Sequence, residues 1–144
     1  MAQLLGGVGG VLVLDAEGLT KLAGGDALAR SLFEDARGAG AAIVTAASTL
    51  TEVLRGGQRD APVHRVLRRI EIAPIDEATA RKAGELLGRV GLSGHTHALD
   101  AIVAVVALAR PRPVVLLTSD IDEMTLLTEE PQRPGGERVA VVRV

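Results

Sequence analysis

HALDAIVAVVALARPRPVVLLTSD, residues 97–120, is the stretch of sequence that decides the fold. Its first part is an apolar, alanine-rich segment that predicts a helix over 96–110, and its second part is a short β-branched run that predicts a strand over 113–117. A buried helix that leads directly into a buried strand is typical of α/β proteins.

Similar apolar runs occur along the rest of the chain and predict further strands over 10–14, 41–44, 70–73 and 138–144. Helical patterns fill the intervals, over 26–39, 49–55, 61–69, 76–90 and 122–128. The strand segments are almost continuously apolar, which indicates strands that are buried on both faces of a parallel sheet. The sequence therefore predicts a three-layer α/β/α sandwich with a mostly parallel sheet of about five strands.

Composition favours a single domain over 1–144, with 47% hydrophobic and 24% charged residues. Phe33 is the only aromatic residue, so stacking of nucleic-acid bases on aromatic side chains is nearly excluded. The absence of cysteine excludes disulfides, thiolate zinc sites and cysteine nucleophiles, and we expect a cytoplasmic protein. We expect no membrane association, because the longest apolar run, 101–109, is too short to cross a bilayer.

Charge gives no general attraction to nucleic acid, because the formal net charge is −2. Two local groups of basic residues offset this: one in the middle of the chain, and one after the longest apolar helix. They are Arg55, Arg59, Arg65, Arg68 and Arg69, and Arg110 with Arg112. Each group is either a solvated helix face or a local contact for a polyanion, and the sequence leaves both open.

Four acids stand beside apolar segments. Asp15 ends the run VLVLD and Asp120 follows VVLLTS, so both are expected at the carboxyl edge of the sheet, where open α/β sheets bind ligands. Glu52 follows the strand at 41–44, and Asp100 lies near the start of the apolar helix. Each acid alone could be a cap or turn residue. Together they predict a site for Mg²⁺ or Mn²⁺, because close carboxylates repel one another unless a cation bridges them.

These segments resemble the PIN-domain family, and the whole chain is similar in size and layout to VapC-type toxins of bacterial toxin–antitoxin pairs. The marks are VLVLDAEGL, STLTEVLRG, LDAIVAVVALA and the turn LTSD. The resemblance implies a metal-dependent endoribonuclease that cuts single-stranded or looped RNA. It also implies a homodimer, and a small antitoxin partner whose basic tail enters the acidic pocket.

The resemblance also implies the roles of individual residues. Asp15, Glu52, Asp100 and Asp120 would hold the metal and carry catalysis. Thr118 or Ser119 would orient an acid or the phosphate, and Glu123 or Asp122 would supply a further acid near a second metal.

The sequence also leaves other interpretations open. One is a PIN-like module that binds RNA or protein without turnover. Another is a haloacid-dehalogenase-like phosphatase, which DAEGLT at 15–20 suggests, although Glu17 would then replace the usual second aspartate. His95 and His97 could add a transition-metal ligand or contact phosphate. Because this pair alone is not a complete ligand set, we expect two loop histidines beside a helix start.

Overall fold

The structure is a computed structural model that describes Leu5 and residues 9–144. Its sheet has five strands in the order β3-β2-β1-β4-β5, and every neighbouring pair is parallel. The strands are β1 (Val11–Leu14), β2 (Ala42–Ala46), β3 (Glu71–Ala73), β4 (Val114–Thr118) and β5 (Ala140–Arg143). The predicted parallel sheet is confirmed, with each strand within a few residues of its expected position.

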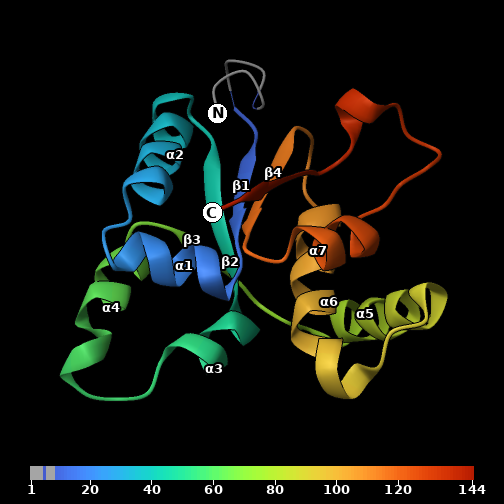
Figure 1. Cartoon of the computed structure of the whole chain (residues 1–144), viewed down its shortest axis with the longest axis horizontal. Helices are drawn as coiled ribbons and strands as arrows, with labels where there is room; N and C mark the ends of the chain where they lie inside the picture. The colour runs from blue at the N-terminus through green and yellow to red at the C-terminus, as the bar shows by residue number, and fades with distance from the viewer. Residues whose placement is uncertain (1–4, 6–8) are drawn as a thin grey trace.

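Helices cover both faces of the sheet (Figure 1). One layer contains α1 (Ala16–Ala23), α2 (Ala27–Gly38) and α4 (Ala61–Leu67). The other contains α5 (Glu77–Val90), α6 (Gly94–Leu108) and α7 (Ile121–Leu127). A short helix, α3 (Leu50–Val53), follows β2 through a 3-10 turn, Ala47–Thr49. The three-layer α/β/α sandwich is therefore confirmed.

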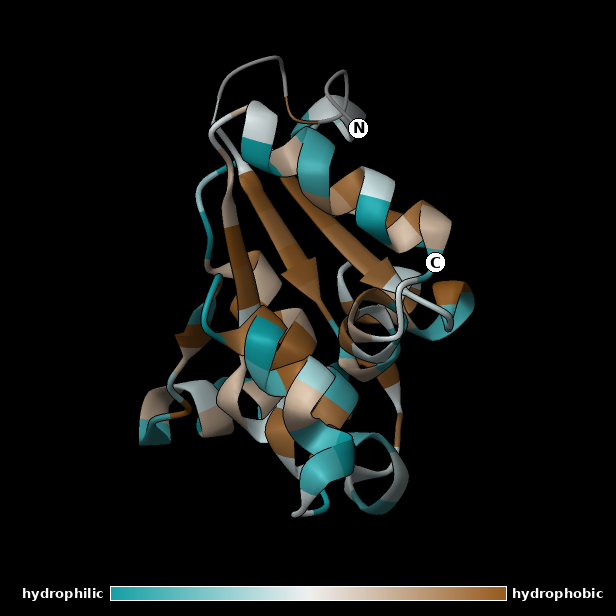
Figure 2. Cartoon of the chain, turned by 90° about the vertical axis from the view of Figure 1, so that its left-hand side faces the viewer, coloured by the Kyte–Doolittle hydropathy of each residue, from teal (hydrophilic) through white to brown (hydrophobic). Residues whose placement is uncertain are grey.

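Alternate side chains of β1 enter opposite halves of the core. Val11 and Val13 pack with the layer of α5 and α6, whereas Leu12 and Leu14 pack with the layer of α1 and α2. All four are buried, which explains why this strand is continuously apolar in sequence. Figure 2 shows the strands as hydrophobic ribbons between helices that are hydrophilic only in part.

The strand order places a reversal of direction at the centre of the sheet. After β1 the chain builds β2 and β3 on one side, and it then returns through α5 and α6 to form β4 on the other side of β1. The carboxyl ends of β1 and β4 therefore border the point at which the connections diverge. Open α/β sheets bind their ligands at this point.

Helix α1 is the element that the sequence did not predict. Gly18 in its first turn and the pair Gly24 and Gly25 after it lower the helical propensity of the segment. Gly18 nevertheless has a packing reason, because a Cβ there would lie 3.1 Å from the carbonyl oxygen of Leu117 on β4. Glycine lets α1 approach the sheet closely.

Helix α6 begins at Gly94, two residues earlier than expected, and Ser93 caps it by accepting a hydrogen bond from the His95 amide at 3.2 Å. The expectation that His95 and His97 are loop residues is therefore wrong, since both lie in the first turns of this helix. Within the described residues, no single helix is long and apolar enough to cross a membrane.

Candidate metal centre

Asp15 lies at the junction of β1 and α1. Its carboxylate caps α1 by accepting a hydrogen bond from the Gly18 amide at 2.8 Å, and the residue is only 7% exposed. Burial raises the pKa of Asp15, the hydrogen bonds from Gly18 and Thr118 oppose this, and the charges of Asp100 and Glu17 raise it further. This carboxylate is thus buried next to other acids.

Thr118, the last residue of β4, connects two of the acids. Its buried hydroxyl accepts a hydrogen bond from the Asp120 amide at 3.0 Å and donates one to Asp15. Asp120 in turn caps α7 by accepting from the Glu123 amide at 3.1 Å. Because β1 and β4 are neighbouring parallel strands, this threonine fixes Asp15 and Asp120 at the same edge of the sheet.

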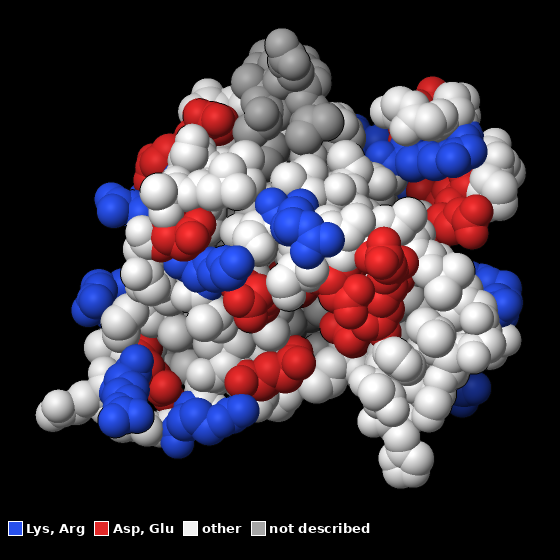
Figure 3. Space-filling view, viewed as in Figure 1, with Lys and Arg blue, Asp and Glu red and all other residues white. Residues whose placement is uncertain are grey.

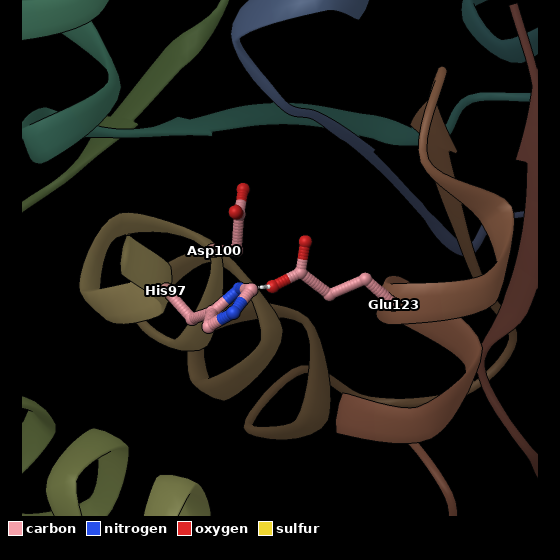
Figure 4. Close-up of side chains that lie close together, drawn as sticks. All are labelled: His97, Asp100 and Glu123. Atoms are coloured by element: carbon pink, nitrogen blue, oxygen red, sulfur yellow. Dashed lines mark hydrogen bonds and ion pairs between the residues drawn. The ribbon is translucent and has the colours of Figure 1, made fainter. Parts of the chain in front are cut away.

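Three side chains from two helices form the tightest group. His97 and Asp100 project from α6 toward Glu123 of α7 (Figure 4), and their potential ligand atoms all lie within 4.8 Å of one another. The His97 ring contacts the Glu123 carboxylate directly through Nδ1. This contact places an imidazole inside the acidic group.

The pKa values of Asp100 and Glu123 show how crowded this group is. Burial raises the pKa of Asp100, the charge of Asp120 raises it further, and His97 lowers it. Burial also raises the pKa of Glu123, followed by the charge of Asp100, again against His97. Ionising both acids is therefore unfavourable in the absence of an added cation.

Glu52 approaches the group from α3. The side chain stands at the exposed rim, and its pKa is raised first by partial loss of hydration and then by the charges of Asp100 and Asp15. Electrostatic coupling thus connects the acid after β2 with those after β1 and on α6, although these residues are far apart in sequence.

The charges of the four principal acids influence one another's pKa values, but among them only Asp100 belongs to the close group, which it forms with His97 and Glu123. Asp122 lies outside this group and lines a groove of about 440 Å³ between α7 and the segment around Val139. Ser119 is exposed, and its carbonyl oxygen accepts a hydrogen bond from Arg143 at 2.9 Å.

The sequence favoured a loop position for His97, whereas the structure places it beside Asp100 and Glu123. The signal for this position was its spacing of three residues from Asp100, which puts both side chains on one face of a helix. The partner on α7 had no such local signal, because 26 residues separate Glu123 from His97.

Asp60 shows that a buried acid alone is not a sign of a metal site. It is 5% exposed, yet its Oδ2 accepts hydrogen bonds from the amides of Arg55 at 3.0 Å and Gly56 at 2.7 Å. The backbone of its own loop compensates its buried charge. The acids of the candidate centre instead raise one another's pKa.

The donor set fits a hard divalent cation. It consists of carboxylate oxygens with one imidazole, and oxygen ligands are those that Mg²⁺ and Mn²⁺ prefer. A cation would also relieve the mutual repulsion that raises the pKa of these acids. Figure 3 shows acidic side chains gathered around a hollow at the centre of this face, with most of the basic side chains further out.

Comparison with known proteins supports the fold. No protein-family model matches the chain, and no curated protein matches it significantly. Among solved structures, the chain is similar to a chain in the crystal structure of VapBC2 from Rickettsia felis bound to a DNA fragment from their promoter. The identity is 18%, the TM-score is 0.65, and the match covers 93% of this chain and 98% of the other. The likeness confirms that the chain has the PIN-like fold that its sequence predicted.

Proposed function

We propose that the protein is a Mg²⁺- or Mn²⁺-dependent endoribonuclease and the toxin of a toxin–antitoxin pair. The observation that carries this proposal is the convergence of Asp15, Glu52, Asp100, Asp120 and Glu123 at the point where the sheet connections diverge. Such a cluster of carboxylates suits hydrolysis of a phosphodiester without a nucleophilic side chain.

Each side chain has a distinct task in this proposal. Thr118 and the Gly18 amide hold the Asp15 carboxylate in place. The Asp120 carboxylate is held by the hydrogen bond that it accepts from the Glu123 amide at the start of α7. His97 orients Glu123 through the ring contact. The acids hold the cation, which when bound would activate water and neutralise charge on the phosphate.

The substrate that we propose is RNA, as the resemblance to PIN-domain toxins implies. A phosphodiester chain is drawn to a metal-loaded acidic pocket despite the net charge of −2, and the near absence of aromatic residues argues against recognition by base stacking. Sequence preference would then depend on the shape of single-stranded or looped RNA.

The proposed partner is a small antitoxin with a basic tail. An arginine of that tail would supply positive charge to the same carboxylates and form bidentate hydrogen bonds with them. The similar solved structure is that of VapBC2 bound to a DNA fragment from their promoter. For this chain we propose a comparable complex with an antitoxin. A homodimer and a cytoplasmic location complete the proposal.

The direct test measures cleavage of total cellular RNA by the wild type and by Asp100→Asn. Each protein is assayed with Mg²⁺, with Mn²⁺ and with EDTA, and the ends of the products are sequenced. We expect divalent-dependent cleavage by the wild type and almost none by Asp100→Asn. A matched control is Asp26→Asn, which keeps the cap of α2 far from the centre. A folded wild type that binds no divalent metal and does not cleave RNA would identify a non-catalytic module. Turnover of a chromogenic phosphomonoester without RNA cleavage would identify a phosphatase.

Toxicity is a separate test of the toxin assignment. Expression of the chain alone should arrest bacterial growth, and co-expression of the neighbouring small gene should relieve the arrest. Harmless expression of an active ribonuclease would contradict the toxin role while leaving the chemistry intact.

A further inference from the structure

Arg143 is a basic residue fixed at the carboxyl edge of the sheet. It ends β5 and pairs in register with Thr118, the threonine that connects Asp15 and Asp120. Its Nη1 donates a hydrogen bond to the carbonyl oxygen of Ser119 at 2.9 Å. The guanidinium is therefore tied to the turn that carries the acids.

The guanidinium is not neutralised by an acidic side chain, because Arg143 belongs to none of the ion pairs found among residues 9–144. The raised pKa values of Asp15, Glu52, Asp100 and Glu123 are opposed by no lysine or arginine, only by His97 and by hydrogen bonds. Arg143 is exposed and keeps further N–H donors for an external anion.

Lys21 of α1 stabilises the same strand end. Its Nζ donates to the carbonyl oxygen of Val144 at 2.8 Å, directly after Arg143. This contact restrains the backbone that carries the guanidinium. Basic side chains border the central acidic group in Figure 3, so positive and negative charge meet at this edge.

We propose that Arg143 binds a phosphate of the RNA strand next to the one that is cut, and that Lys21 holds Arg143 in position. This inference rests on the proposed ribonuclease function. A guanidinium forms charge-assisted, bidentate bonds with phosphate. Because Arg143 is not a counter-ion of the pocket carboxylates, it acts on a neighbouring phosphate and sets the register of the strand.

The test compares Arg143→Gln and Arg143→Lys with a matched control, Arg138→Gln. Arg138 precedes the other end of β5, is also exposed, and also donates to backbone carbonyls, those of Arg133 and Pro131. Steady-state cleavage of a short single-stranded RNA is measured at several salt concentrations. Binding of the same labelled RNA is measured by fluorescence anisotropy in the Asp100→Asn background, where cleavage does not interfere.

Arg143→Gln should raise KM and the anisotropy Kd about 10-fold, as expected for loss of one charge-assisted hydrogen-bonded contact, with kcat within about twofold. The slope of log(kcat/KM) against log salt should shrink by about 0.7, the value for one lost phosphate contact on a single strand. Arg143→Lys should retain the slope and part of the affinity. Arg138→Gln should match the wild type.

Unchanged KM, Kd and salt slope in Arg143→Gln would overturn the inference. So would a fall in kcat and in melting temperature at constant KM, because that result assigns Arg143 a purely structural bond to Ser119. If the wild type fails to cleave RNA but Arg143→Gln still weakens RNA binding, the proposed function is wrong and the phosphate contact stands.

Discussion

Replacing Asp100 by asparagine should stabilise the metal-free protein while removing its activity. Carboxylate oxygens of Asp100 and Glu123 lie within 4.8 Å of each other. Two full charges at this separation repel by about 3.5 kcal/mol at an effective dielectric constant of 20. His97 and partial hydration reduce this, so we expect a net gain of about 1–2 kcal/mol. For a chain of this size, that gain raises Tm by about 2–8 °C.

The gain should depend on pH with a definite sign. The pKa of Asp100 is raised above its ordinary value of 3.8, so ionisation costs more in the folded than in the unfolded state. Its contribution to stability is therefore fully present below the unfolded pKa and is lost as pH rises through the folded pKa. The asparagine side chain does not titrate, so wild type and Asp100→Asn should be similar near pH 4 and diverge toward pH 7.

Thermal unfolding followed by circular dichroism in EDTA at pH 4 and pH 7 measures the effect. Repeating it with Mg²⁺ at about 100 times its Kd should stabilise the wild type by about 2.7 kcal/mol and the variant by much less. Asp26→Asn is the control, because asparagine caps α2 as well as aspartate does. A lower Tm for Asp100→Asn than for the wild type in EDTA at pH 7 would refute the proposed repulsion between Asp100 and Glu123. Equal stabilisation of both proteins by Mg²⁺ would refute the role of Asp100 in binding the cation.

Three further predictions address the other acids and the packing of α1. Glu52→Gln should lower kcat/KM for steady-state RNA cleavage with Mg²⁺ at least about 100-fold, which is a loss of roughly 2.7 kcal/mol of transition-state stabilisation. Near-normal rates would place Glu52 outside the centre. Burial and neighbouring acids raise the pKa of Asp15, Asp100 and Glu123. In a pH profile of cleavage, kcat/KM should therefore begin to fall at a pH above the ordinary carboxylate range. A profile that stays flat down to pH 4 would contradict this. Gly18→Ala should destabilise the protein by about 1–2 kcal/mol in urea unfolding, since the new Cβ would lie 3.1 Å from a β4 carbonyl oxygen. The control Gly84→Ala, on α5 with open space around it, should instead stabilise the protein by about 0.5–1 kcal/mol.

The strands were predictable because burial on both faces requires apolar residues at consecutive positions. Each strand of the sheet centre is a short, unbroken apolar run, such as VLVL or VVLLT, that ends at a polar turn. Two of the acids were predictable for the same reason. Asp15 and Asp120 closely follow adjacent parallel strands, so the sheet register alone fixes them at one edge.

The remaining parts depend on packing that no local pattern records. Helix α1 was missed because Gly18 weakens the helical signal, and its benefit arises only against Leu117 of a distant strand. The choice between Asp122 and Glu123 is set by how α7 rotates on its Asp120 cap, which directs Glu123 toward α6.

Charge distribution supports the proposal that this site binds a positive group from outside the chain. The pKa values of four of its acids are raised, and within the described residues their charge is opposed by one imidazole and by no lysine or arginine. Elsewhere the chain pairs half-buried charges, as Arg112 and Glu130 do at 2.7 Å. Arg143, at the same edge of the sheet, donates instead to a backbone carbonyl. The proposed cation and an arginine of the proposed antitoxin would therefore compete for the same carboxylates. Either one would stabilise the fold most at neutral pH, where the unpaired acids destabilise it most.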